Sequence, residues 1–172
     1  MILVGLGANL IYKNFQSPSE NLILAIDELY HKGISVCKRS KIYKSSPVPL
    51  SHQPLYYNAV IEVKCNLDPR ELLNILHEVE LSLGRIRKEK WSERVIDLDL
   101  LSYNDFIISN SIKIPHPRMH ERSFVLRPMS DIAPFWTHPI IKKSISDLNM
   151  CLNDGQIIAP LSDEGYPKNW NF

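Results

Sequence analysis

Hydrophobic and polar positions repeat with two different periods along the first hundred residues, and the change of period marks the expected elements. Residues 2–6 are almost wholly apolar, which is typical of a buried strand. Apolar residues then recur at helical spacing after Ser17 and again after Asp68, each followed by a proline and, three residues on, by a glutamate. This order favours a capped helix start, and Gly33 and Gly84 are suitable stops. The pattern therefore predicts one helix before each glycine.

Further segments have the character of strands. Residues 34–38 and 41–44 predict one long or broken strand, residues 58–63 alternate between two faces, and residues 95–103 predict another strand. The order strand, helix, strand, strand, helix, strand is that of the split βαβ or ferredoxin-like arrangement. We therefore expect an α+β fold with a ferredoxin-like βαββαβ core, in which both helices pack on one face of an antiparallel sheet.

The chain after residue 106 is expected to form a C-terminal extension of this core. Prolines at positions 115, 117, 128, 134 and 139 break it repeatedly. Helices are predicted around residues 119–126 and 145–151, whereas residues 165–170 carry no firm signal. Because no linker or low-complexity run divides the sequence, residues 1–172 are interpreted as a single domain.

Composition and charge limit the range of functions. The 172 residues are 44% hydrophobic and 23% charged, as in ordinary globular proteins. The net charge of +1 gives no overall field toward nucleic acid or a membrane surface, so an anion site must come from local clustering. The three cysteines show neither metal-ligand nor disulfide spacing, and the apolar start lacks a basic leader. We therefore expect a cytoplasmic protein with no nucleic-acid or membrane partner. A monomer is a separate expectation, because the sequence does not give the oligomeric state.

The clearest chemical feature is the pair Asp97 and Asp99 in a predicted strand. Side chains alternate along a strand, so Ile96, Leu98 and Leu100 face the core. The two carboxylates share the other face, with Cα atoms roughly 6.5 Å apart, and repel unless something neutralises them. Mg²⁺ accepts one or two protein carboxylates beside water and phosphate oxygens, and two carboxylates can also hold two ions. Taken alone, a solvated strand face with two acids explains the pair equally well.

Basic residues just before this strand change that balance. The ten positions 85–94 contain five basic residues and only two acids. The basic residues are Arg85, Arg87, Lys88, Lys90 and Arg94, and the acids are Glu89 and Glu93. Arginine forks match phosphate oxygens and stabilise charge on a transferred group. A basic surface loop is the simpler interpretation of these residues alone, but beside a same-face acid pair a magnesium–triphosphate site explains both. Trp91 could stack on a planar ring, although tryptophan more often packs.

Two further groups could contact a ligand. His116 stands between two prolines that fix its backbone, near Arg122, which makes a phosphate or nucleotide contact plausible. Tyr56 and Asn58 follow a proline-rich loop, residues 45–54, and offer an aromatic face and an amide with donors and an acceptor. A surface histidine and an ordinary loop are the simpler alternatives. The sequence contains no P-loop, so side chains and metal ions must hold any triphosphate.

Taken in order, these pieces resemble the 6-hydroxymethyl-7,8-dihydropterin pyrophosphokinase family of folate biosynthesis. The resemblance runs from Leu6-Gly7-Ala8-Asn9-Leu10 to Asp131-Ile132-Ala133-Pro134 and so covers most of the chain. Five motifs carry it: Gln53-Pro54-Leu55-Tyr56-Tyr57-Asn58-Ala59, Gly84-Arg85-Ile86-Arg87, Trp91-Ser92-Glu93-Arg94-Val95-Ile96-Asp97-Leu98-Asp99, Pro115-His116-Pro117-Arg118-Met119 and Arg122-Ser123-Phe124-Val125-Leu126. Each motif is modest alone, but all five in this order are highly specific.

The resemblance implies an enzyme that transfers the pyrophosphoryl group of MgATP to the 6-hydroxymethyl group of the reduced pterin and leaves AMP. ATP is then a co-substrate, and the partners are small molecules. By position, the resemblance assigns two Mg²⁺ ions to Asp97 and Asp99, and charge stabilisation in a mobile loop to Arg85 and Arg94. It assigns ATP contacts to Arg87, Trp91, His116 and Arg122, and pterin contacts to Ser45, Val48, Tyr56, Asn58 and Phe124.

The chain departs from the family pattern at three places. Pro49 stands where the pattern has a glycine in the pterin loop, and Pro117 stands where some members have a tyrosine. The stretch from Lys88 to Trp91 is one residue short, so Lys90 receives no role. None of these departures removes a metal ligand.

Two other classes of protein remain as alternatives. Another metal-dependent phosphohydrolase or nucleotidyl-transfer enzyme could use the same aspartates without needing the pterin loop. A nucleic-acid module of βαββαβ type would need paired aromatic residues on its central strands and a basic domain. The expected strand faces carry Asp97, Asp99 and Asn58 instead, and the near-neutral charge also disfavours that class.

Overall fold

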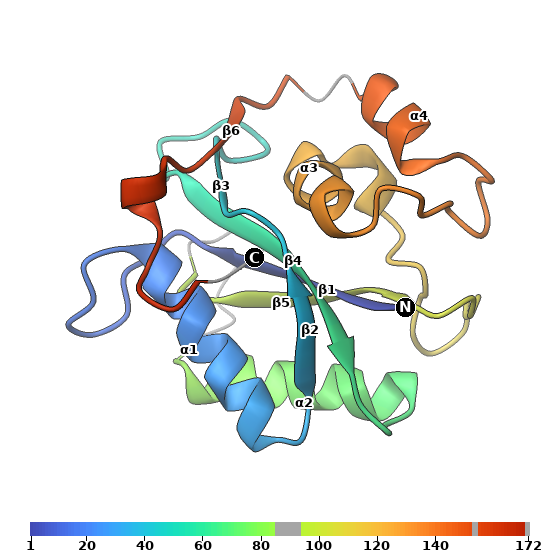
Figure 1. Ribbon diagram of the computed structural model, residues 1–172, viewed down its shortest axis with the longest axis horizontal. Coiled ribbons are helices and arrows are strands. Elements are labelled where there is room, and N and C mark those ends of the chain that lie inside the picture. The colour runs from blue at the N-terminus through green and yellow to red at the C-terminus, as the bar shows by residue number, and fades with distance from the viewer. Residues whose placement is uncertain (85–93, 153–154, 171–172) are drawn as a thin grey trace.

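The computed structural model describes residues 1–84, 94–152 and 155–170. Its elements are, in chain order, β1 (Ile2–Ala8), α1 (Pro18–His31), β2 (Ser35–Arg39), β3 (Tyr43–Ser45), β4 (Tyr56–Lys64), α2 (Pro69–Ser82), β5 (Asp97–Tyr103), α3 (Ser123–Ile132), α4 (Ile145–Met150) and β6 (Ile158–Pro160). Short 3₁₀ turns lie at Met119–Glu121 and Asp163–Gly165. Figure 1 shows three layers, with α1 and α2 on one side of the sheet and α3 and α4 on the other.

The strands form one antiparallel sheet. The order across it is β5-β1-β4-β3-β6, and β2 pairs with β4 next to β3. β2 and β3 are the two halves of the predicted broken strand, since they pair with residues 61–64 and 56–58 of β4. Ser40 lies at the break, where its hydroxyl accepts from the Val60 amide at 2.9 Å. The ferredoxin-like order of strands and helices is thereby confirmed.

Both predicted helix starts are confirmed by reciprocal caps. The carboxylates of Glu20 and Glu71 accept from the backbone amides three residues earlier, at 3.1 and 2.8 Å, and the side chains at those earlier positions accept in return. Such caps satisfy amides that have no partner inside the helix. The chain leaves the two helices through Gly33 and Gly84, whose φ angles of 80° and 82° would strain a residue with a side chain.

Strand alternation divides the apolar residues into two cores. One core joins the sheet to α1 and α2, and its members include Ile2, Val4, Leu6, Leu22, Leu29, Ala59, Ile61, Val63, Leu72 and Leu76. The other joins the opposite face to the extension through Leu3, Val60, Leu101, Met119, Leu126 and Met129. The two core helices therefore share one face as expected, but the extension adds a layer on the other face that the pattern did not predict.

The extension differs from its predicted form in one further respect. The helix expected around residues 119–126 is displaced, because a 3₁₀ turn comes first and α3 begins only at Ser123. Pro128 lies inside α3 and does not break it, contrary to expectation. Its ring removes one amide donor but is buried in the apolar layer, which offsets the lost hydrogen bond. The helix predicted around residues 145–151 is confirmed as α4.

The tail after α4 returns to the sheet, which no sequence signal predicted. β6 pairs with β3, and the buried Trp170 donates its indole N–H to the Ser40 carbonyl at 3.0 Å. The Arg39 guanidinium donates to the Asn169 carbonyl at 2.9 Å. The tail is thus hydrogen-bonded to β3, to Ser40 at the break and to the end of β2. Among the described residues, no helix has the length and apolar character needed to cross a membrane.

Candidate active site

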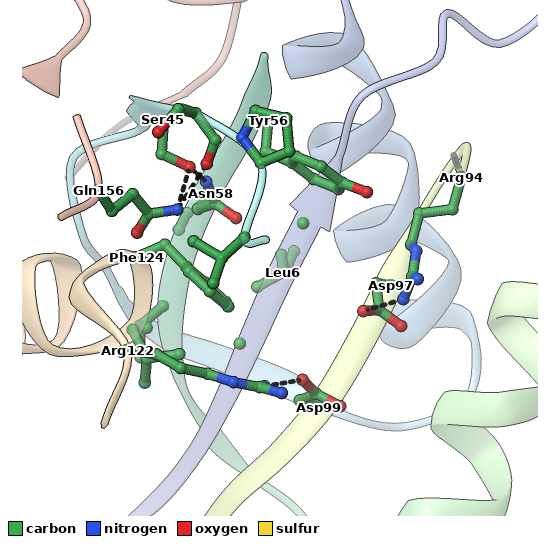
Figure 2. A pocket seen from close by; sticks show the side chains of 18 of the residues that line it. Leu6, Ser45, Tyr56, Asn58, Arg94, Asp97, Asp99, Arg122, Phe124 and Gln156 are labelled. Atoms are coloured by element: carbon green, nitrogen blue, oxygen red, sulfur yellow. Dashed lines mark hydrogen bonds and ion pairs between the residues drawn. The ribbon is translucent and has the colours of Figure 1, made fainter. Parts of the chain in front are cut away.

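A pocket lies on the α3 side of the sheet. Its floor comes from β1, β4 and β5, and its walls come from the loop between β3 and β4, the start of α3 and the tail before β6 (Figure 2). Residues that point away from the α1 and α2 core enter it, because side chains alternate along each strand. Nine of the predicted site residues line it: Ser45, Val48, Tyr56, Asn58, Arg94, Asp97, Asp99, Arg122 and Phe124.

β5 presents two carboxylates to one end of the pocket. Ile96, Leu98 and Leu100 are buried toward α1 and α2, while Asp97 and Asp99 are partly exposed on the pocket side. The predicted division of this strand into an apolar and an acidic face is therefore confirmed.

A buried glutamate holds the same strand from α2. The Leu98 amide donates to the Glu80 carboxyl group at 2.7 Å, and Glu80 is only 1% exposed. A buried acid is stable only when its oxygens are hydrogen-bonded, so this contact serves both groups. Since Leu98 lies between Asp97 and Asp99, Glu80 restrains the backbone from which both carboxylates project.

Each of the two aspartates faces an arginine: Asp97 pairs with Arg94, three residues earlier, and Asp99 faces Arg122, from the segment before α3. Arg94 Nη1 lies 2.7 Å from Asp97 Oδ2, and Arg122 Nη1 lies 3.6 Å from Asp99 Oδ2. Burial lowers the pKa of Arg94, but the surrounding carboxylates outweigh burial and raise that pKa overall. For Arg122, burial prevails over Asp99 and lowers the pKa. A guanidinium stays charged in proteins, so two cations stand beside two anions here.

The backbone that carries Arg94 is tied to the turn after β1. The amides of Asn9 and Leu10 donate to the Arg94 carbonyl at 3.1 and 3.2 Å, and the Arg94 amide donates to Asn9 Oδ1 at 2.8 Å. The buried Asn21 donates to the carbonyls of Leu10 and Val95, both at 2.7 Å. Sequence reasoning missed these two asparagines, which place the start of β5 over the pocket.

The donor set at this end suits Mg²⁺. In the described ranges, 1–84, 94–152 and 155–170, no three His, Cys, Asp or Glu side chains gather closely enough to hold a metal ion. A metal ion that needs three or more of these side chains as ligands therefore finds no site in these ranges. Mg²⁺ needs only one or two carboxylates when water and phosphate complete its shell. Asp97 and Asp99 therefore fit the ion that the sequence predicts.

The other end of the pocket combines aromatic rings with an amide. Tyr56 from β4 and Phe124 from α3 enter it from different walls (Figure 2). The buried Asn58 donates from Nδ2 to Ser45 Oγ at 2.9 Å. A Cβ at Gly7 would lie 3.3 Å from Asn58 Oδ1, so glycine in β1 leaves room for this amide. A flat, polar ring can stack and hydrogen-bond in such surroundings.

His116 lies beside the pocket and is not among the residues that line it. Its amide donates to the Leu101 carbonyl at 2.8 Å, and its Nδ1 accepts from the Arg118 amide at 3.2 Å. Burial, and then Arg122, lower the pKa of His116 to about 4, against an opposing effect of Asp97. The ring is therefore neutral near pH 7 and carries its proton on Nε2, where it can donate to a phosphate.

The remaining predicted site residues are Arg85, Arg87 and Trp91, which lie outside the described residues. Conversely, the pocket contains side chains that sequence reasoning missed. Gln53 accepts from the Tyr56 hydroxyl at 3.1 Å, and Gln156 reaches the pocket from the tail. Gln53 stands in a quoted motif and could have been found there, whereas nothing in the sequence around Gln156 points to the pocket.

The fold and this two-ended pocket together fit the class of ferredoxin-like enzymes that bind a phosphate chain beside a flat heterocycle. The chain matches the family model "7,8-dihydro-6-hydroxymethylpterin-pyrophosphokinase (HPPK)" over residues 3–134, and it therefore belongs to that family.

Individual relatives agree with this assignment. The 2-amino-4-hydroxy-6-hydroxymethyldihydropteridine pyrophosphokinase of Synechocystis sp. is 39% identical over 149 residues, which are 85% of this chain and 73% of that protein. The protein of the same name from Bacillus subtilis is 41% identical over 103 residues, 59% of this chain and 62% of that protein.

Longer proteins also contain a similar region. The Folic acid synthesis protein fol1 of Pneumocystis carinii is 40% identical over 146 residues, which are 84% of this chain but only 19% of that protein. A crystal structure of wild-type Plasmodium falciparum HPPK-DHPS has a TM-score of 0.66 at 14% identity, over 86% of this chain and 43% of that one. This chain thus spans about a fifth of the fol1 protein and under half of the Plasmodium chain, and the structural likeness concerns the fold.

Proposed function

We propose that this protein transfers the pyrophosphoryl group of ATP to the 6-hydroxymethyl group of 6-hydroxymethyl-7,8-dihydropterin, giving the pterin diphosphate and AMP. One observation carries the proposal. In a member of this family, a single pocket joins Tyr56, Asn58 and Phe124 at one end to Asp97 and Asp99 at the other. The names of the Synechocystis and Haemophilus influenzae relatives state the same activity for those proteins.

The aromatic end would bind and orient the pterin. Tyr56 and Phe124 offer ring faces for stacking, and Asn58 offers donors and an acceptor to the edge of the heterocycle. Ser45 and Val48 complete the wall of the loop between β3 and β4. A ring held on its faces and one edge has little rotational freedom, so its hydroxymethyl group is held in a single orientation.

The acidic end would bind the triphosphate of ATP. Asp97 and Asp99 would hold two Mg²⁺ ions, which, when bound, neutralise charge on the phosphate oxygens. Arg94 and Arg122 stand beside these carboxylates, so their guanidinium groups can turn from the acids to the phosphates. His116 would donate from Nε2 to the same chain. From the resemblance, Arg85, Arg87 and Trp91 would join them.

The reaction would be an in-line displacement. The hydroxymethyl oxygen bonds to the β-phosphorus of ATP, the bond from that phosphorus to the oxygen bridging the α-phosphate breaks, and AMP leaves with that oxygen. The hydroxyl proton passes to solvent. The protein's part is to hold two reactants in line and to surround the transferred group with fixed positive charge.

The nucleotide product tests the proposal. The purified protein is incubated with MgATP, with and without the pterin, and the nucleotides are separated by chromatography. Pterin-dependent AMP supports the proposal. Pterin-independent ADP or phosphate would contradict it and favour the other phosphotransfer class, which would use Asp97 and Asp99 without the aromatic end.

We further propose a cytoplasmic monomer as the acting form. Cys37, Cys65 and Cys151 are free thiols, which suits a reducing compartment. Light scattering during size-exclusion chromatography would show a dimer if this proposal were wrong.

A further inference from the structure

The tail contributes a side chain to the heterocycle end of the pocket. Gln156 lines the pocket although it lies well beyond residue 134, the last residue that the family model matches. The next residue joins the tail to the loop between β3 and β4: the Ile157 amide donates to Ser46 Oγ at 3.2 Å, and the Ser46 amide donates to the Ile157 carbonyl at 2.9 Å. Gln156 is thus held against the loop by backbone contacts on its C-terminal side.

The orientation of the Gln156 amide follows from its neighbours. Nε2 lies 2.6 Å from the Ser46 carbonyl oxygen and 3.3 Å from Ser45 Oγ. A backbone carbonyl can only accept, so the amide atom next to it is the nitrogen. Gln156 is therefore a donor to both residues of the loop, and Figure 2 shows its amide nitrogen directed at Ser45.

Ser45 links this donor to Asn58. Its hydroxyl oxygen accepts from Asn58 Nδ2 at 2.9 Å and from Gln156 Nε2 at 3.3 Å, and both Ser45 and Asn58 are buried. A hydroxyl has two lone pairs and one hydrogen, so both lone pairs are engaged and the hydrogen must point elsewhere. The position of the Ser45 hydroxyl therefore decides where the Asn58 amide nitrogen rests.

We propose that Gln156 is a positioning residue for the heterocyclic substrate. By donating to Ser45 Oγ and to the Ser46 carbonyl, it holds the Ser45 hydroxyl at the position where Asn58 donates to it. It thereby fixes where the Asn58 amide lies against a ring edge that carries both donors and acceptors. The inference rests on the proposed function, because it takes the substrate at this end to be the pterin.

Two variants separate this role from simple space filling. Gln156→Ala removes the donor together with its volume, whereas Gln156→Met removes the donor but keeps most of the size. We expect the KM for the pterin to rise about tenfold in both variants, because neither can hold the Ser45 hydroxyl and the Ser46 carbonyl. The KM for ATP and kcat should change less than about twofold. A space-filling role predicts instead that the methionine variant stays close to wild type.

A combined variant tests the route through Ser45. If Gln156 acts through Ser45, adding Gln156→Ala to Ser45→Ala should raise the KM for the pterin by less than about twofold over Ser45→Ala alone. A further tenfold rise would overturn the proposed route. Ile157→Ala is the matched control, because its side chain is 78% exposed and its backbone contacts are unchanged. Its KM should equal that of wild type.

The outcomes distinguish this inference from the proposed function. Pterin-dependent AMP from wild type, with an unchanged pterin KM in both Gln156 variants, would overturn the inference and leave the proposed function standing. No pterin-dependent AMP from wild type, together with no pterin binding by calorimetry, would overturn both. Thermal unfolding of each variant shows whether it is folded. Should Gln156→Ala fail to fold, Gln156→Met, which keeps most of the side-chain volume, decides between positioning and space filling.

Discussion

At the scale of single residues, Asp97 is the side chain on which the proposed chemistry depends most directly. It pairs with Arg94 at 2.7 Å and stands on the strand face where phosphate and metal would meet. We expect Asp97→Asn to lower kcat about 10²- to 10³-fold, because the neutral amide cannot hold the cation that offsets phosphate charge. Steady-state AMP formation over a Mg²⁺ titration measures the effect.

The control for this substitution is Asp105→Asn, at an exposed position just after β5, which should leave the rate unchanged. A near-normal rate in Asp97→Asn would refute the metal assignment.

Arg94 is expected to act on the transferred group more than on the pterin. It lies at the acidic end, and its backbone is held independently by Asn9. We predict that Arg94→Ala lowers kcat by on the order of 100-fold while the Kd of the pterin rises less than about threefold, since the guanidinium stabilises charge that develops during transfer. Turnover and pterin titration by fluorescence give the two quantities. Arg127→Ala, exposed on α3, is the control, and equal losses in both quantities would contradict the prediction.

At the scale of elements, the turn between α3 and α4 is stabilised by a histidine that can be protonated. The buried His138 accepts at Nδ1 from the amides of Ile140 and Ile141, both at 3.2 Å, with His120 and Trp136 against its ring. Burial, and then His120, lower the pKa of His138 below its ordinary value. A protonated Nδ1 could no longer accept from these amides.

The sign of the pH effect follows from that pKa. As the pH falls below about 6.5, the unfolded chain takes up the proton before the folded one, so the stability that His138 contributes is lost on the acidic side. Asparagine can offer an acceptor to the same amides and does not titrate. We therefore predict that the unfolding temperature of wild type falls more steeply between pH 7 and pH 5 than that of His138→Asn. Parallel slopes would show that another group controls the loss.

The elements of the core were predictable because their signals are local. Capping residues precede both core helices by fixed spacings, and alternation in β4 and β5 separates core positions from pocket positions. The extension was harder to predict, because Pro128 disfavours a helix when only its sequence neighbours are considered. The burial of α3 against the sheet decides the outcome, because its apolar residues share a core with Leu3, Val60 and Leu101, which lie far away in the chain.

At the scale of the whole molecule, the site was predictable only in part for the same reason. The resemblance placed Asp99 and Arg122 in one site, but it could not show that they face each other at 3.6 Å. Gln156 meets Ser45 across 111 residues of sequence, in a tail without a firm pattern. Contacts of this kind arise from packing, which short-range periodicity does not encode.

The tail also bears on the stability of the whole fold. Trp170 is buried and hydrogen-bonded to Ser40, where β2 gives way to β3. We predict that Trp170→Ala lowers the free energy of unfolding by about 3–5 kcal/mol, the cost of deleting a buried aromatic side chain. Trp170→Phe should cost less, since it keeps most of the packing. Urea unfolding measures both.

Phe135→Ala is the matched control for Trp170, since that ring is 94% exposed and its loss should be nearly neutral. A Trp170→Ala protein as stable as wild type would mean that the tail does not stabilise the sheet.

The distance in sequence between Ser45 and Gln156 has a consequence for the newborn chain. At a synthesis rate of about 5–20 residues per second, the ribosome needs roughly 6–22 seconds to pass from one to the other. In the last part of that interval, once β5 has been made, all the floor strands exist but the wall beside Asn58 is unfinished. A ligand that favours the completed pocket can stabilise only chains whose tail has already docked. The cell's supply of substrate would therefore protect finished molecules from unfolding and degradation without helping unfinished ones to fold.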